Sequence, residues 1–398
     1  MKVTHNFSLI LSLLAVLSVA QAQNTRPSSS PATSVASAPA SSSTSPKAIY
    51  AQAVAYKGPY STLQDLQKAL LAEGPITSPD FQQRDVIVRS FESFILKEPF
   101  DQNPEIVRYF RTMCDHAIDQ IAAEKGETPG VKIWKLYASS YVCRAGNTVF
   151  AFDLNAGLHS QRWQPTSAPN WSAPPKTDTD FVMTDEQIAR LAKLVDVAFY
   201  SHQDIDHIDY QFIHEMIKAG KTVVVTPPVL KLDGYKDFAN KLTAFTPEEG
   251  KVYPFDELKV EALATRQEYA PPRPSVPDNV YLVTTPTGVV CMHKGDANVG
   301  EEAWKYFEAY KKRGGKVDIY MGGYSGFARG KDTFHAEQKI HDAFNDFIIP
   351  GHSYEWGHLR LGNGKVMTYY DILATEAERL KAGRGCVLTW GECYWYKP

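Results

Sequence analysis

The stretch Phe199-Tyr200-Ser201-His202-Gln203-Asp204-Ile205-Asp206-His207 decides the interpretation of this chain. It follows a largely apolar run, residues 194–200, that predicts a buried strand. Residues 208–219 after it repeat apolar side chains at helical spacing. The stretch therefore forms a strand-to-helix loop, where a rigid scaffold presents side chains to a site. Four side chains in this loop can bind a metal ion: His202, Asp204, Asp206 and His207.

The residue types in this loop indicate which metals it suits. Alternate positions of an extended loop point the same way, so residues 202, 204 and 206 can converge. Imidazole and carboxylate ligands together suit zinc, iron or manganese. An acidic surface loop that happens to hold two histidines would show the same local pattern. The position after a buried strand, together with two later segments, favours the metal site.

The two later segments also carry ligand types at the ends of predicted strands. Met292-His293-Lys294-Gly295-Asp296 follows the second strand of a predicted hairpin, and Ile348-Ile349-Pro350-Gly351-His352 follows another short apolar run. Rigid strand ends hold metal ligands in place. We therefore expect Asp296 and His352 to join the residues of the first loop.

These segments, in this order, resemble the signature of the metallo-β-lactamase superfamily. That signature is His-x-His-x-Asp-His after a strand, then a further His, an Asp after a Gly, and a segment similar to Pro-Gly-His. Ala151-Phe152-Asp153-Leu154 also resembles the acidic strand end common in the family. The resemblance covers about residues 130–398. It implies an α/β fold, the αββα sandwich, with one or two divalent metal ions, usually zinc, at the strand edges.

The resemblance also implies a role for each matching residue. Asp206, His207 and His352 would hold one metal ion, and Asp206 would also orient the reacting water. Asp296 would bridge to a second ion or support the first. His202 would be a ligand of the other position.

The chain departs from the family pattern at two places. Asp204 stands where the family has His, and it is either a ligand or a general base. No His occurs between His214 and His293, where the family has its third ligand for the first metal. We therefore expect one intact metal position and one that is carboxylate-rich, weakened or empty, where iron or manganese is also plausible. The candidates for the missing ligand follow a predicted strand: Arg266, Gln267 and Glu268.

A glycine-rich loop, residues 322–330, offers candidate substrate contacts in Tyr324 and Arg329. It lacks the lysine of a phosphate-binding loop. A plain turn is the alternative interpretation.

Composition limits the partners and the compartment. The chain has 398 residues and a formal charge of −3 without a basic block, which disfavours nucleic acid as a partner. Residues 1–22 have the pattern of a cleaved signal peptide, with an apolar stretch from Phe7 to Ala20 and a small-x-small end at Ala20-Gln21-Ala22. We expect export to the periplasm or the extracellular space, and no membrane association after cleavage.

Four regions follow from the pattern along the chain. After the signal peptide, residues 23–57 read as a disordered Ser/Ala/Pro linker. Residues 58–129 read as a helical region, and residues 130–398 as the metallo-β-lactamase-like domain. We expect the last strand at residues 386–390. Cys386 and Cys393 lie close enough in sequence to pair across a turn, and export permits disulfides.

The expected function is an exported, metal-dependent hydrolase of a small ester, lactone or phosphodiester. A bound ion lowers the pKa of water and polarises a carbonyl or phosphoryl oxygen. The incomplete histidine set disfavours β-lactam hydrolysis. Two alternatives remain: an iron-dependent oxidoreductase, and a degenerate, non-catalytic binding protein. Neither the substrate nor the oligomeric state follows from the sequence.

Overall fold

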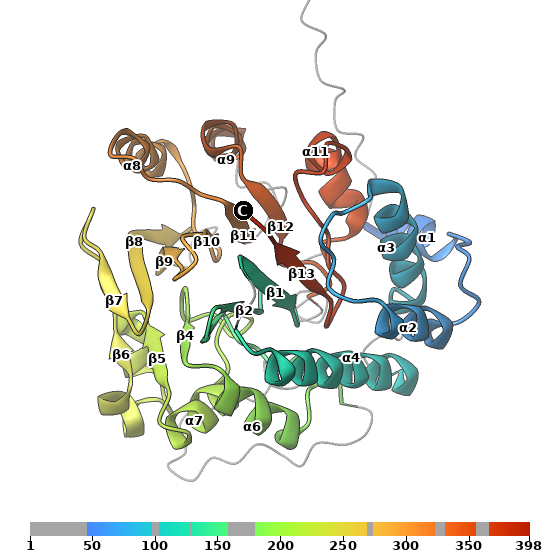
Figure 1. The fold of residues 1–398 in the computed structure, drawn as a ribbon, viewed down its shortest axis with the longest axis horizontal. Coiled ribbons are helices and arrows are strands. Elements are labelled where there is room, and N and C mark those ends of the chain that lie inside the picture. Colours follow the sequence, from blue (N-terminus) through green and yellow to red (C-terminus); the bar gives the residue numbers. More distant parts are fainter. Residues whose placement is uncertain are drawn as a thin grey trace, which may run out of the picture. The chain divides into compact units, whose positions relative to one another are not determined.

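Two facing β-sheets with helices on both outer sides form the main part of this protein (Figure 1). The computed structural model describes residues 46–97, 103–126, 129–157, 180–268, 274–322, 331–355 and 366–398. All of them belong to one compact unit, Thr44–Pro398. Tyr324 and Arg329, the predicted substrate contacts, lie outside the described residues.

The first sheet has the strand order β13-β1-β2-β3-β4-β5-β6. Strands β3, β4 and β5 run parallel to one another, so their carboxyl ends lie at the same edge. In chain order the strands are β1 (Val131–Lys135), β2 (Tyr141–Ala145), β3 (Thr148–Phe152), β4 (Val197–Phe199), β5 (Thr222–Val225), β6 (Thr243–Ala244) and β13 (Cys393–Tyr396).

The second sheet has the strand order β12-β11-β10-β9-β8-β7. Strands β10, β11 and β12 are parallel, and β9 pairs with β10 as the predicted hairpin. In chain order the strands are β7 (Tyr253–Phe255), β8 (Leu258–Gln267), β9 (Val276–Thr284), β10 (Val290–His293), β11 (Ile319–Gly322) and β12 (Phe347–Pro350).

Three apolar layers hold the unit together. The middle layer lies between the sheets and includes Phe152, Phe199, Tyr281 and Met321. The layer outside the second sheet packs Leu282 and Met292 against the outer helices α8 (Glu301–Lys312) and α9 (Lys331–Phe344). The layer outside the first sheet is covered by α2 (Leu63–Ala72), α3 (Phe81–Ile95), α4 (Pro104–Ala123), α6 (Asp185–Leu194) and α7 (Tyr210–Lys218).

Three of the helices begin at residues with strong capping chemistry. Thr62 and Thr184 form capping boxes at α2 and α6, and Asn103 caps α4 ahead of Pro104. These caps satisfy backbone N–H groups that have no partner inside the helix. The remaining helices are α1 (Pro46–Val54), α11 (Tyr369–Lys381) and two short 3-10 helices, η2 (Pro227–Lys231) and η3 (Lys236–Lys241). No helix of the described residues is long and apolar enough to cross a membrane.

Three expectations from the sequence are wrong. The linker prediction fails for residues 46–54, which form α1 beside α3, with Ala53 buried. The last strand is β13, because the backbone of residues 391–392 bonds to Lys135 and aligns residues 393–396 with β1. Residues 386–390 are therefore an irregular segment. Cys386 and Cys393 are both buried free thiols.

Candidate metal centre

Five of the six predicted ligands meet where strands of both sheets end. His202, Asp206 and His207 follow β4 of the first sheet, whereas Asp296 follows β10 and His352 follows β12 of the second. The carboxyl ends of parallel strands lie at one edge of a sheet, which is why these separated segments converge. Two overlapping groups could each hold a metal ion. One is His202, His207 and Asp296; the other is Asp206, His207 and His352.

The donor atoms of the two groups lie close together. The Nε2 atoms of His207 and His352 are 2.6 Å apart. One carboxylate oxygen of Asp296 is 2.8 Å from His352 Nε2 and 3.4 Å from His207 Nε2. A carboxylate oxygen of Asp206 lies 3.6 Å from His207 Nε2 and 3.8 Å from His352 Nε2. These nitrogen and oxygen donors therefore surround one small volume.

A buried nitrogen tests whether the group fits a metal ion. His202 is fully buried, and its Nε2 has no hydrogen-bond partner among the described residues. A buried polar atom without a partner is costly, so native proteins rarely leave one. His202 belongs to a ligand group with His207 and Asp296. A neutral imidazole nitrogen can donate its lone pair to a divalent cation. The set of nitrogen and oxygen donors at this place fits such an ion.

The electrostatics around His207 also favour a cation. Burial by itself lowers the pKa of His207, but the carboxylates of Asp206, Asp296 and Asp153 raise it well above its usual value. The same carboxylates would stabilise a divalent ion at this place. His207 is fully buried, so solvent screens these interactions little.

Asp153, directly after β3, orients the ligands. Its carboxylate accepts hydrogen bonds from the backbone N–H of Ser201 (2.7 Å) and the hydroxyl of Ser201 (2.8 Å). It also lies 2.7 Å from Nδ1 of His207 and 2.6 Å from Nε2 of His293. Burial acts to raise the pKa of Asp153, but His293 and His207 hold it well below its usual range. The contact with Nδ1 turns Nε2 of His207 toward the other donors.

A similar bond orients His202. The Ser201 hydroxyl gives its only proton to Asp153, so its oxygen accepts from His202 Nδ1 at 2.9 Å. This leaves Nε2 of His202 as the nitrogen with a free lone pair. Burial, and next to it His207, lower the pKa of His202 to about 3, which keeps the imidazole neutral.

Asp204 lies beside the two groups and belongs to neither. Its carboxylate is 3.9 Å from Nε2 of His202, and its side chain is 15% exposed. The loop backbone turns after Asp204, whose carbonyl accepts from the N–H groups of His207 and Ile208. This turn brings Asp206 and His207, but not Asp204, into the groups.

One of the three residues proposed for the missing ligand contacts Asp296 through a side-chain amide. Gln267, the last residue of β8, donates from Nε2 to the second oxygen of Asp296 at 2.6 Å. Arg266 instead bonds Ser275 at 2.7 Å, and Glu268 is exposed. Of the three candidates, only Gln267 reaches the cluster, and it does so as a hydrogen-bond donor to Asp296.

Sequence reasoning missed Asp278, in β9. This carboxyl is fully buried, 3.3 Å from His202 Nδ1, and accepts from the backbone N–H of Asp296 at 3.0 Å. Burial, and then Asp296, raise the pKa of Asp278 well above its usual value. The available signal was an acid inside a strand whose two faces are both buried. The sequence pattern predicts the first strand of the hairpin over residues 280–285, which leaves Asp278 outside it.

The fold and the cluster together define a class of protein. Two facing sheets with helices on both outer sides form an αββα sandwich, and histidines and aspartates lie at the ends of its strands, as the sequence resemblance predicted. No family model and no curated protein matches the chain.

Similar solved structures exist at low identity. The metallo hydrolase Igni18 from Ignicoccus hospitalis is 16% identical, with 66% of this chain and 97% of that chain covered and a TM-score of 0.43. The metallo-β-lactamase fold protein YhfI from Bacillus subtilis is 11% identical, with 67% and 99% covered and a TM-score of 0.41. The diiron β-hydroxylase CmlA from Streptomyces venezuelae is 12% identical, with 72% and 61% covered and a TM-score of 0.42. Likeness at this level carries no activity or substrate to this chain.

Proposed function

We propose that this protein is an exported, metal-dependent hydrolase that acts on a small ester, lactone or phosphodiester. The observation that carries the proposal is the convergence of His202, Asp206, His207, Asp296 and His352. The buried Nε2 of His202, which has no hydrogen-bond partner in the described part of the chain, supports it. The signal-like residues 1–22 support export. The family resemblance supports the substrate class.

The residues divide into holding and reacting roles. Asp206, His207 and His352 would hold one divalent ion. Asp296 belongs to the other candidate group, with His202 and His207. Zinc is the proposed metal; iron and manganese are the alternatives that carboxylate ligands allow. When bound, the ion supplies Lewis acidity, which lowers the pKa of a water molecule and polarises the oxygen of a carbonyl or phosphoryl group.

The protein's own side chains prepare that reaction. Asp153 and Ser201 hold His207 and His202 in the tautomers that expose Nε2. Asp206 is 13% exposed, so its carboxylate is accessible to a water molecule and can accept its proton. Gln267 binds one oxygen of Asp296 and leaves the other facing the two histidines. We propose that Asp204 acts as a general acid or base and does not bind the metal ion.

Elemental analysis of the purified protein followed by a hydrolysis screen tests the proposal. We expect one or two equivalents of metal per chain, and His352→Ala should lose both metal and activity. His214→Ala is the matched control, because His214 lies on α7 with a side chain 46% exposed. It should keep both properties. Asp206→Asn should keep the fold and lose roughly 100-fold or more in rate.

Three results would contradict the proposal or its ligand assignment. Iron with a visible absorption band and no hydrolysis would favour the oxidoreductase alternative. No metal after supplementation, with unchanged stability in chelator, would favour a binding protein. Retention of metal and activity in His352→Ala would refute the ligand assignment.

A further inference from the structure

The loop that carries His352 has an unusual backbone. His352 has φ +57° and Tyr354 has φ +62°, although neither is glycine. Residues other than glycine adopt this left-handed region at a cost, and keep it only where surrounding contacts hold them there. What holds this loop therefore also determines where the imidazole of His352 points.

A buried lysine contacts the loop on both sides of His352. Lys135, the last residue of β1, is fully buried, and its amine donates to the carbonyl of Pro350 at 3.1 Å and to the hydroxyl of Ser353. Among the described residues it forms no ion pair. Burial lowers the pKa of Lys135 to about 7, and Glu392 opposes that shift. Buried lysines are rare because the charged amine loses its hydration, so a specific role is expected.

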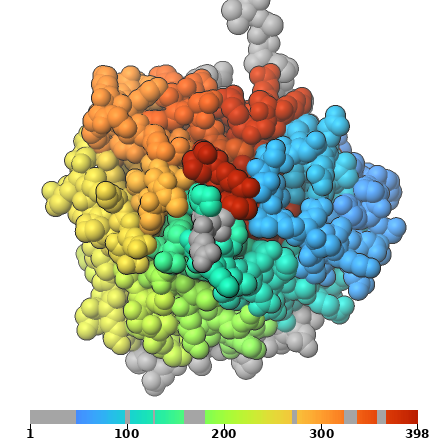
Figure 2. Space-filling model, in the orientation of Figure 1, coloured from blue at the N-terminus to red at the C-terminus, as the bar shows by residue number. Residues whose placement is uncertain are grey.

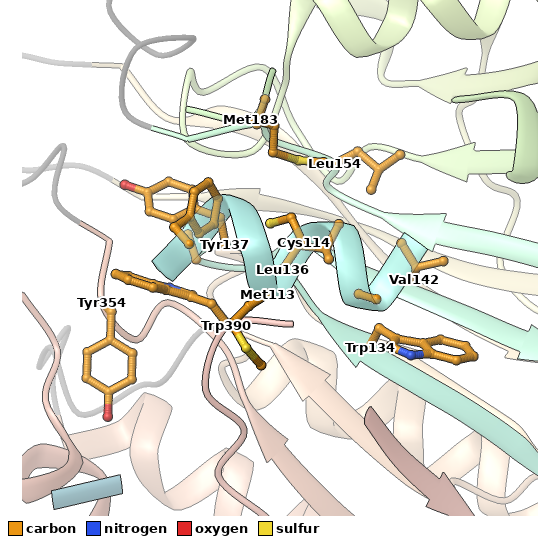
Figure 3. Close-up of a cluster of buried hydrophobic side chains, with 14 of the residues drawn as sticks. Met113, Cys114, Trp134, Leu136, Tyr137, Val142, Leu154, Met183, Tyr354 and Trp390 are labelled. Atoms are coloured by element: carbon orange, nitrogen blue, oxygen red, sulfur yellow. The ribbon is translucent and has the colours of Figure 1, made fainter. Parts of the chain in front are cut away.

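Tyr354, two residues after His352, packs against other aromatic side chains. The ring of Tyr354 lies edge-on to Phe91 of α3, with 5.1 Å between ring centroids, and 6.4 Å from Trp390. Figure 3 shows Tyr354 beside Trp390 at the margin of the buried cluster. The amine of Lys135 lies 6.0 Å from the centre of the Tyr354 ring. One side chain thus contacts the loop before His352, after it, and at its aromatic anchor.

Lys135 itself is fixed in place. Its backbone N–H donates to the carbonyl of Glu392, and its carbonyl accepts from Gly391. The carboxylate of Glu392 in turn accepts two bonds of 2.7 Å from Arg84 of α3. Figure 2 shows the N-terminal helices directly against the C-terminal segment. The loop is therefore tied to strand β1 and, through it, to the N-terminal helical region.

We propose that Lys135 is a positioning residue for the metal centre, which holds the loop 350–353 so that Nε2 of His352 meets Asp296 and His207. The inference rests on the proposed function, because it requires His352 to be a ligand. It adds a role for the helical region, whose helix α3 supports both Lys135 and Tyr354.

The affinity of the full chain for Zn²⁺ alone tests this role. Lys135→Met should bind Zn²⁺ roughly ten- to a hundred-fold more weakly, as is typical when a partner that orients a ligand is lost. Lys132→Met is the matched control. It makes the same change on the same strand and removes a contact with Glu124, away from the loop. It should bind Zn²⁺ like the wild-type protein.

Ser353→Ala provides a gentler variant in case Lys135→Met does not fold. It removes only the hydroxyl that Lys135 contacts, and should weaken Zn²⁺ binding several-fold with little loss of stability in chelator. A purely structural lysine would lower the stability of the metal-free protein and leave Zn²⁺ affinity unchanged. Wild-type affinity in Lys135→Met, or in Ser353→Ala where the first variant is unfolded, would overturn the inference. Failure of the wild-type protein to bind Zn²⁺, Fe²⁺ or Mn²⁺ would overturn the proposed function with it.

Discussion

A single carboxylate, that of Asp153, orders three of the side chains around the cluster. It lies within hydrogen-bonding distance of Ser201, His207 and His293. The first two belong to the loop after β4, and His293 ends β10. Asp153 also has φ +44°, so the backbone turns sharply where β3 ends. That turn lets the carboxylate face back toward the cluster. Asp153 therefore acts through the ligands that it orients.

Glu92 of α3 predicts a pH dependence of stability. Burial raises its pKa from 4.5 to about 8, and its carboxyl accepts from the backbone N–H of Tyr369. Because the folded-state pKa is the higher one, its stabilising contribution is complete below about pH 4.5 and is lost as the pH rises toward 8. Glu92→Gln keeps the acceptor and does not ionise. Relative to wild type, it should gain on the order of a few kcal/mol between pH 5 and pH 8.

Urea unfolding of both proteins across this pH range measures the difference. Asp85→Asn, on the same helix but partly exposed, is the control and should show no comparable trend. A constant difference between Glu92→Gln and wild type would contradict the assigned pKa.

A buried ion pair joins helix α3 to the C-terminal segment. Arg84 and Glu392 form two bonds of 2.7 Å, and both side chains are 7% exposed. Arg84 also donates to the carbonyl of Val387, and Glu392 accepts from the N–H and hydroxyl of Thr389. These bonds shape the irregular segment 387–392 that precedes β13. The pair therefore holds the segment that precedes β13 against helix α3.

Arg84→Met should destabilise the protein by about 3–5 kcal/mol, because it leaves the negative charge of Glu392 buried without its cationic partner. Arg89→Met makes the same change one and a half turns along α3. Its pair with Asp85 is more exposed, so we expect a loss of about 1 kcal/mol or less. Chemical denaturation measures both. Equal losses of unfolding free energy in the two variants would mean that burial of the Arg84–Glu392 pair adds nothing to its contribution.

The whole molecule places the candidate ligands on both sheets. Strand β4 of the first sheet leads to His202, Asp206 and His207. Strands β10 and β12 of the second sheet lead to Asp296 and His352. A metal ion held by these residues would link the two layers across the middle core. Its binding energy would then add directly to the stability of the folded state.

Metal removal should therefore lower the melting temperature. A ligand at about 1,000 times its dissociation constant stabilises a protein by about 4 kcal/mol, so excess chelator should shift the transition by several degrees. His352→Ala should melt at the same temperature with and without chelator, and His214→Ala should respond like wild type. A chelator effect of equal size in His352→Ala would place the stabilising metal elsewhere.

The local signals in the sequence were sufficient for the hairpin, the ligand-bearing strand ends and the helices with clear apolar periodicity, but not for α1. Capping boxes, apolar periodicity and the spacing of His202, Asp206 and His207 are properties of neighbouring residues, which a sequence displays directly. The last strand was misplaced because residues 386–390 and 393–396 have similar strand-like composition. Long-range bonds to Lys135 and Arg84 made the choice between them.

The sequence by itself determined an α/β sandwich and the segments that supply the candidate metal ligands, because strand periodicity and ligand spacing are local. The αββα arrangement was what the resemblance to the metallo-β-lactamase superfamily implied. Only the tertiary structure decided that Asp204 stays outside both groups and that Gln267 and Asp278 bind Asp296. It alone brought Lys135 to Ser353, 218 residues away. Contacts of this kind depend on how two sheets and a helical layer pack, and no neighbouring residues encode that arrangement.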